Sequence, residues 1–217
     1  MINKVHILSV GYSRCDPLDS TSMKANCSST LIKTYCGKNI IVDTMTAWDG
    51  DFIVKALKAN SLEPDDINYV VCTHGHSDHI GCNYLFPNAE WHFVGSCMSH
   101  HDKYPDYDWE HPYSLVEGEV EIISTPGHTM NCISLLVNNT DFGGTVGVCG
   151  DLFENSQDVW DSQIWISAGS ENQKMQKENR LKLAKLCSYI IPGHGEGFVV
   201  TDDIRNKLQQ DCNEIIM

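Results

Sequence analysis

The stretch that decides the fold is Thr73-His74-Gly75-His76-Ser77-Asp78-His79, which directly follows the apolar run Tyr69-Val70-Val71-Cys72. A short apolar run bounded by turn residues predicts a buried strand. His74 and His76 are two residues apart, so in extended backbone their rings project from the same side. The sequence therefore places two imidazoles together at the carboxyl end of a buried strand.

Three later polar residues repeat this context, because each follows its own short apolar run and a glycine. Side chains at the ends of adjacent strands come together, so we expect these residues to join the first cluster. Five imidazoles and two carboxylates are more than one tetrahedral metal needs, and they suffice for two metals that share a carboxylate. The sequence therefore predicts a metallohydrolase, with the candidate metal ligands His74, His76, Asp78, His79, His128, Asp151 and His194.

Length and composition favour an ordinary globular protein. The chain has 217 residues, 41% of them hydrophobic and 20% charged, which suits one domain over residues 1–217. No apolar run is long enough to span a membrane, and the first residues are too polar for a signal peptide. None of the ten cysteines is spaced Cys-x-x-Cys, so we expect reduced thiols. These features predict a cytosolic protein that does not bind membranes, with the nucleus as a further location.

The charge balance bears on possible partners. A net charge of −14 opposes non-specific binding to polyanions. A helix expected over about Glu171–Leu186 is the local exception, since it carries five of the fifteen basic residues. The ordinary interpretation is a solvated face, and the alternative is a surface that contacts phosphates. The residues concerned are Lys174, Lys177, Arg180, Lys182 and Lys185.

Apolar periodicity predicts more strands than helices in the first two thirds of the chain. Other helices are expected at Phe52–Ala59, Asp78–Leu85 and Asp203–Ile215. This mixture favours an α/β (α+β) protein, a four-layer αβ/βα sandwich of two mixed sheets covered by helices, over a doubly wound parallel sheet. Strands are expected at Val5–Val10, Ser29–Tyr35, Ile40–Asp43, Ile67–Cys72, Trp91–Val94, Val120–Ser124, Ile133–Val137, Thr145–Cys149 and Tyr189–Ile191.

The motif His-x-His-x-Asp-His at residues 74–79, followed in order by His128, Asp151 and His194, resembles the signature of the metallo-β-lactamase superfamily. The resemblance covers the whole chain and implies that fold. It implies that His74, His76 and His128 hold a first metal, that Asp78, His79 and His194 hold a second, and that Asp151 bridges them. It also implies that Asp43 supports the ligands, and that Asp78 and Asp151 take part in catalysis.

Asp151 makes the chain resemble other branches of the superfamily more than the true β-lactamases, because true β-lactamases of this fold mostly lack the bridging aspartate. The stretches Val70–Asn83, Leu85-Phe86-Pro87 and Gly150-Asp151-Leu152-Phe153-Glu154 are similar to the animal metallo-β-lactamase domain-containing protein 1 family. That similarity implies an endoribonuclease, a phosphodiesterase acting on the 3′ ends of histone pre-mRNA. The acidic composition opposes an RNA substrate.

Two other functions stay open at this point. One is hydrolysis of a small thioester, ester or lactone, as in hydroxyacylglutathione hydrolases. The other is a non-catalytic protein whose metals serve binding. A homodimer is a further expectation under any of these functions. Two zinc ions suit the ligands, although iron and manganese also suit them. The aromatic-rich segments Gly95–Leu115 and Asn155–Ser170 are expected either to line the pocket, with His100 in its wall and the second segment as a lid, or to pack on the sandwich.

Overall fold

The apolar runs of the chain form two mixed sheets within residues 2–213, which the computed structural model describes. The strands of the first sheet are, from edge to edge, β1 (Lys4–Ser9), β4 (Ser29–Lys33), β5 (Asn39–Val42), β6 (Tyr69–Cys72), β7 (Trp91–Val94) and β8 (Cys97–Ser99). Those of the second are β14 (Phe198–Val199), β13 (Tyr189–Pro192), β12 (Val146–Gly150), β11 (Ile133–Val137), β10 (Val120–Ser124) and β9 (Tyr113–Val116).

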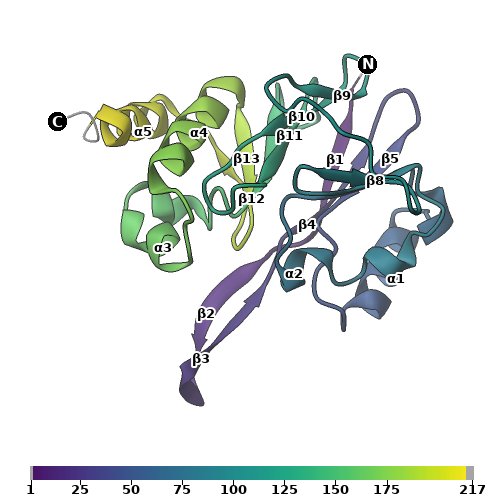
Figure 1. Cartoon of the computed structure of the whole chain (residues 1–217), viewed down its shortest axis with the longest axis horizontal. Helices are drawn as coiled ribbons and strands as arrows, with labels where there is room; N and C mark the ends of the chain where they lie inside the picture. Colours follow the sequence, from purple (N-terminus) through teal and green to yellow (C-terminus); the bar gives the residue numbers. More distant parts are fainter. Residues whose placement is uncertain (1, 214–217) are drawn as a thin grey trace.

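Helices cover the outer face of each sheet, so the expected four-layer αβ/βα sandwich is confirmed (Figure 1). Helix α1 lies against the first sheet, and α4 and α5 lie against the second (Figure 1). The helices are α1 (Gly50–Ala59), α2 (Ser77–Ile80), α3 (Ser162–Ser167), α4 (Gln173–Leu186) and α5 (Asp202–Asn213). Short 3₁₀ turns occupy Pro64–Asp66, Asn83–Leu85 and Ser156–Val159.

Burial on both faces explains why the strands read as continuous apolar runs. Successive side chains of a strand point to opposite faces of its sheet. Val71 therefore belongs to the core between the two sheets, whereas Val70 packs in the core that includes Ile53 and Leu57 of α1. A strand covered on both faces needs apolar residues at every position, and all four residues of β6 are buried.

The largest departure from expectation is a hairpin that the sequence analysis left without structure. Strands β2 (Tyr12–Asp16) and β3 (Asp19–Asn26) pair with each other in a separate two-stranded sheet. The hairpin projects from the body of the molecule (Figure 1), and most of its residues are exposed. Because neither of its faces is buried in a core, its sequence carries no apolar alternation from which a strand could be predicted.

The helices also differ from expectation near the metal-ligand motif. The helix predicted over Asp78–Leu85 is only the four-residue α2, followed by the separate turn Asn83–Leu85. Gly81 lies between them, so close to the loop before α1 that a Cβ would sit 2.2 Å from the Ala47 nitrogen. The last residues of the helix expected to end at Ile215 lie outside the described range. No helix among the described residues is long and apolar enough to cross a membrane.

Arg180 does not belong to the basic surface that the sequence suggested. Its side chain is buried, and its guanidinium contacts both carboxylate oxygens of Asp158, at 3.0 and 2.6 Å. The same guanidinium donates a hydrogen bond to the Leu152 carbonyl at 2.9 Å. Arg180 therefore ties α4 to the loop that follows β12. Lys182 and Lys185 remain exposed on α4, so the helix presents a weaker basic face than predicted.

Replacing Arg180 with alanine should lower the free energy of unfolding by about 3–5 kcal/mol, because it would leave Asp158 as a buried charge without its partner. Lys182→Ala, on an exposed position of the same helix, should change it by less than about 0.5 kcal/mol. Urea denaturation of both variants measures the difference. Equal losses would show that the buried ion pair contributes nothing specific to stability.

Candidate metal centre

The first group of candidate ligands forms where β6 and β12 end. His74, His76, His128 and Asp151 each offer one ligand atom, and these atoms all lie within 4.8 Å of one another. The Nε2 atom of His128 is 3.1 Å from the Nδ1 atom of His76. His74 and His128 are buried, whereas His76 is exposed. One cation in this space would have three imidazoles and a carboxylate around it.

A second group lies beside the first and faces the same aspartate. Asp78, His79 and His194 also offer ligand atoms within 4.8 Å of one another. The Nε2 atom of His194 is 3.8 Å from Asp78 Oδ2. The structure thus brings together all seven residues that the sequence analysis proposed as metal ligands.

Asp151 connects the two groups. Its Oδ1 lies 3.2 Å from His79 Nε2, and its Oδ2 lies 3.2 Å from His194 Nε2 and 3.6 Å from His74 Nε2. Gly193 leaves room for this carboxylate, because a Cβ there would sit 1.9 Å from Asp151 Oδ1. A carboxylate with imidazoles from both groups around it has the position that a bridging ligand needs.

Asp43 orients the ligands from behind. Its Oδ2 lies 3.0 Å from Nδ1 of His79, and its Oδ1 accepts a hydrogen bond from the backbone N–H of Thr73 at 2.7 Å. Engaging Nδ1 leaves Nε2 of His79 directed at Asp151. A carboxylate behind a metal-binding histidine fixes the orientation of the ring and raises its basicity.

His194 is oriented by the hairpin. Its Nδ1 lies 3.0 Å from the backbone carbonyl oxygen of Asn26, the last residue of β3. This contact turns Nε2 toward Asp151. The base of the projecting hairpin therefore forms part of the support of the centre, a role that no sequence motif indicated.

Unsatisfied atoms in the centre show that it fits a cation. Nε2 of His74, Nε2 of His79 and Oδ1 of Asp151 are buried and have no hydrogen-bond partner among the described residues. Burying such atoms without partners costs free energy. Metal coordination would satisfy all three, and the mixed nitrogen and oxygen donors suit zinc.

The pKa shifts of the metal-free centre follow from burial and from Asp151. Burial lowers the pKa of His74 well below its usual value, which keeps the ring neutral and its lone pair available. Burial also lowers the pKa of His79, but Asp151 and Asp43 outweigh it and raise that pKa overall. The pKa of Asp151 is well below its usual value, because His79 and His74 outweigh the opposite effect of burial. The centre thus holds an ionised carboxylate among imidazoles.

The two aromatic-rich segments lie in different parts of the structure. In Gly95–Leu115, Trp109 donates a hydrogen bond to the Ser96 carbonyl and packs against the core between the sheets. His100 lies outside both ligand groups, with Nδ1 2.7 Å from the Glu90 carbonyl oxygen. Trp109 of the first segment therefore packs on the sandwich, whereas residues 101–106 are exposed. Asn155–Ser170, by contrast, supplies four lining residues to a pocket beside the centre: Asn155, Ile164, Ser167 and Ala168.

Sequence reasoning missed Glu154 as a residue of the site. Its carboxylate lies within 4.8 Å of ligand atoms of Asp151 and His194. The available signal was an acidic residue three positions after Asp151 in an otherwise apolar stretch, Gly150-Asp151-Leu152-Phe153-Glu154. That stretch was used only as a family resemblance.

Comparisons with known sequences agree with this geometry. The profile of the family described as the metallo-beta-lactamase superfamily matches residues 24–194. Metallo-beta-lactamase domain-containing protein 1 of Xenopus laevis is 38% identical over 201 residues, which cover 91% of this chain and 82% of that protein. A Methanocaldococcus jannaschii protein named as a metallo-hydrolase is 34% identical over 165 residues, 76% of this chain and 74% of that protein.

Solved structures share the fold at low sequence identity. A structure of N-acyl homoserine lactone hydrolase, with the product N-hexanoyl-L-homoserine bound at its catalytic metal centre, matches with a TM-score of 0.60 and 21% identity. The match covers 90% of this chain and 94% of that one. The dizinc lactonase AidC matches with a TM-score of 0.59 and 18% identity, over 80% of this chain and 73% of that one.

Protein purified without chelators should contain about two transition-metal ions per chain, since two ligand groups share Asp151. Inductively coupled plasma mass spectrometry measures both the ratio and the metal. A ratio near one with iron as the metal would contradict a two-metal hydrolytic centre.

Asp43→Asn should weaken metal binding by about 10- to 100-fold, because an amide no longer places a negative charge behind His79. Competition with a chromogenic chelator measures the affinity. Asp203→Asn, on an exposed position of α5, is the matched control and should bind metal like the original protein. Unchanged affinity in Asp43→Asn would remove Asp43 from the support of the centre.

Proposed function

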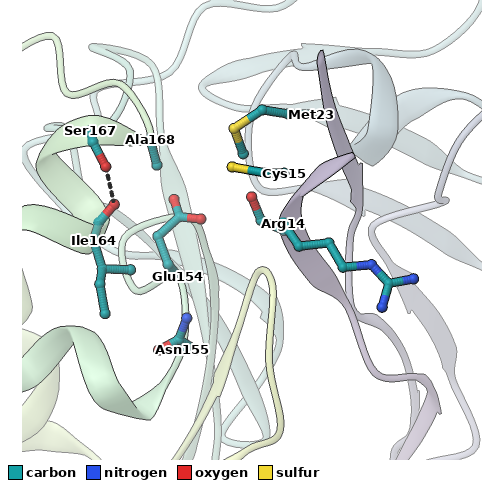
Figure 2. Close-up of a pocket in the computed structure, with 9 residues that line it drawn as sticks. Arg14, Cys15, Met23, Glu154, Asn155, Ile164, Ser167 and Ala168 are labelled. Carbon is teal, nitrogen blue, oxygen red and sulfur yellow. Dashed lines mark hydrogen bonds between the residues drawn. The ribbon is translucent and has the colours of Figure 1, made fainter. Parts of the chain in front are cut away.

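Because this chain belongs to the metallo-β-lactamase superfamily and is a metallo-hydrolase with a His/Asp centre, we propose that its substrate is a small carboxylic ester, lactone or thioester. The observation that carries this choice is the pocket beside the centre, of about 280 Å³. Glu154 lines it together with side chains such as Met23 and Ile164 (Figure 2). The lining pairs Glu154 with one cation, Arg14, and with apolar side chains, so it offers no excess of positive charge to a phosphodiester anion and suits an uncharged acyl group.

The residues of the centre have separate roles in the proposed hydrolysis. When bound, two divalent cations would supply Lewis acidity toward the scissile carbonyl and a hydroxide at neutral pH. His74, His76 and His128 would hold one cation, Asp78, His79 and His194 the other, with Asp151 shared. Asp78 is the more exposed carboxylate of the two groups, at 18% of its side chain against 5% for Asp151. Asp78 is therefore placed to accept a hydrogen bond from the attacking water.

Relatives support the same substrate class and metal. The lactone hydrolase structure holds its product at the catalytic metal centre, and AidC is a dizinc lactonase. We therefore propose zinc as the resident metal, although the ligands also suit iron and manganese. The proposed acyl substrates agree with the net charge of −14, which carries no penalty for an uncharged ligand.

RNA cleavage is the second candidate, supported by the similarity over 91% of this chain to metallo-beta-lactamase domain-containing protein 1. The resemblance to that family implies that the RNA substrate is histone pre-mRNA. Two observations weigh against it: the acidity of the chain, and the burial of Arg180, which takes one cation from the helix expected to contact phosphates.

A panel of substrates on zinc-loaded protein tests the choice: N-butanoyl-homoserine lactone, S-lactoylglutathione, bis(p-nitrophenyl) phosphate and RNA. We expect kcat/KM for the lactone or the thioester to exceed that for the phosphodiester. Asp151→Ala should lose more than about a hundredfold, because it removes the shared ligand, whereas His100→Ala outside the ligand groups should stay within about twofold. Efficient RNA cleavage without acyl turnover would reverse the assignment.

A further inference from the structure

We infer that Glu154 is a specificity residue that recognises an N–H donor, an amide or an ammonium group, carried by the acyl substrate. The inference deepens the proposed function and rests on it for the reacting carbonyl. Glu154 stands in the pocket between the β2–β3 hairpin and α3, close to the metal centre (Figure 2).

The carboxyl group of Glu154 is an acceptor without a donor. Glu154 is only 3% exposed, and its Oε1 has no hydrogen-bond partner among the described residues. Two donors that line the pocket are used or directed elsewhere. Ser167 Oγ donates to the Ile164 carbonyl, and the Arg14 guanidinium points away from Glu154 (Figure 2). A buried acceptor costs free energy until a donor reaches it, so a ligand that brings one gains affinity.

The other residues of the pocket determine which chemical group can be attached to that donor in the substrate. Cys15 and Met23 of the hairpin face Glu154 from one side, with Ile164 and Ala168 of the α3 region on the other (Figure 2). These side chains give an apolar arm, such as an acyl chain, a surface to pack on, beside the polar lining residues Ser13, Arg14, Asn155 and Ser167. The pocket therefore fits an N–H group attached to an apolar arm.

The backbone of Glu154 is held on both sides, so the residue is anchored at the pocket before a ligand arrives. Its N–H donates to Asp158 Oδ2 at 2.7 Å, and Asp158 is itself clamped by Arg180. Its carbonyl accepts a hydrogen bond from the backbone N–H of His194 at 2.8 Å. With the backbone anchored, only the side-chain rotamers of Glu154 remain to be ordered on binding, which favours discrimination between substrates.

The distance to the metal centre sets where the donor must lie in the substrate. The Glu154 carboxylate is within 4.8 Å of ligand atoms of both Asp151 and His194. A donor bound to Glu154 is therefore close to a carbonyl that reacts at the centre. Substrates with an N–H group next to the reacting carbonyl fit this arrangement, as in an α-amino or α-acylamino ester or lactone.

Three lactones that differ at one atom or group test the inference on zinc-loaded protein. N-butanoyl-homoserine lactone carries an amide N–H, homoserine lactone an ammonium, and α-butanoyloxy-γ-butyrolactone an ester oxygen in place of the N–H. We expect kcat/KM to be about tenfold or more higher for the amide than for the ester. Glu154→Leu, which has no acceptor, should abolish this preference.

Glu154→Gln separates the two kinds of donor. It keeps an acceptor oxygen without the charge, so it should retain the preference for the amide and lose turnover of the ammonium lactone relative to it. Glu178→Gln, on an exposed position of α4, is the matched control and should keep the pattern of the original protein. An amide preference that survives in Glu154→Leu overturns the inference. If Glu154→Leu does not fold, the fall in turnover of the ammonium lactone relative to the amide must still appear in Glu154→Gln.

A binding measurement distinguishes this inference from the proposed function. Isothermal titration calorimetry compares the ring-opened product N-butanoyl-homoserine with its ester analogue 2-butanoyloxy-4-hydroxybutanoate. Tighter binding of the amide without lactone turnover supports the role of Glu154 and removes the proposed function. Turnover without any amide preference supports the proposed function and removes the role of Glu154. Loss of metal from Glu154→Gln, measured by mass spectrometry, would make Glu154 a ligand with Asp151 and His194 and overturn its assignment to the substrate.

Discussion

The convergence of four imidazoles on the carboxylate of Asp151 is the constraint on which the rest of the structure depends. Nε2 atoms of His74, His79, His128 and His194 lie 3.2–3.6 Å from its oxygens. His74 and His79 follow β6 of the first sheet, whereas His128 and His194 follow β10 and β13 of the second, so both sheets must be in register for them to meet. Several of the atoms find no donor or acceptor within the described protein, which makes the centre costly until a cation fills it. Stability and metal binding are therefore coupled.

The surrounding structure offsets that cost with contacts that hold each ligand from behind. Asp43 fixes His79 within the first sheet, and the Asn26 carbonyl fixes His194 from the base of the hairpin. Arg180 and Asp158 fix the loop that carries Asp151. The buried ion pair thus contributes to the centre as well as to the packing of α4. The basic residue that the sequence suggested for a surface is part of the interior support of the site.

The features of the fold and the site that could be predicted from the sequence are those that depend on a local pattern of residues. His74, His76, Asp78 and His79 form one motif after one apolar run, so their convergence follows from a strand ending at that point. The hairpin could not be predicted, because its strands bury no face and carry no alternation. The same holds for the position of Arg180, which is set by Asp158 across 22 residues of chain. Long-range partners leave no periodic signal.

Asp151 and Glu154 lie three residues apart in the sequence, and their carboxylates have different surroundings. Asp151 is surrounded by imidazoles on every side that a metal would occupy. Glu154 points instead into a pocket whose remaining walls come from the hairpin and α3 (Figure 2). One carboxylate therefore has a surplus of ligand neighbours and the other lacks a donor. The first arrangement fits a cation, and under the proposed function the second fits a donor that the substrate carries.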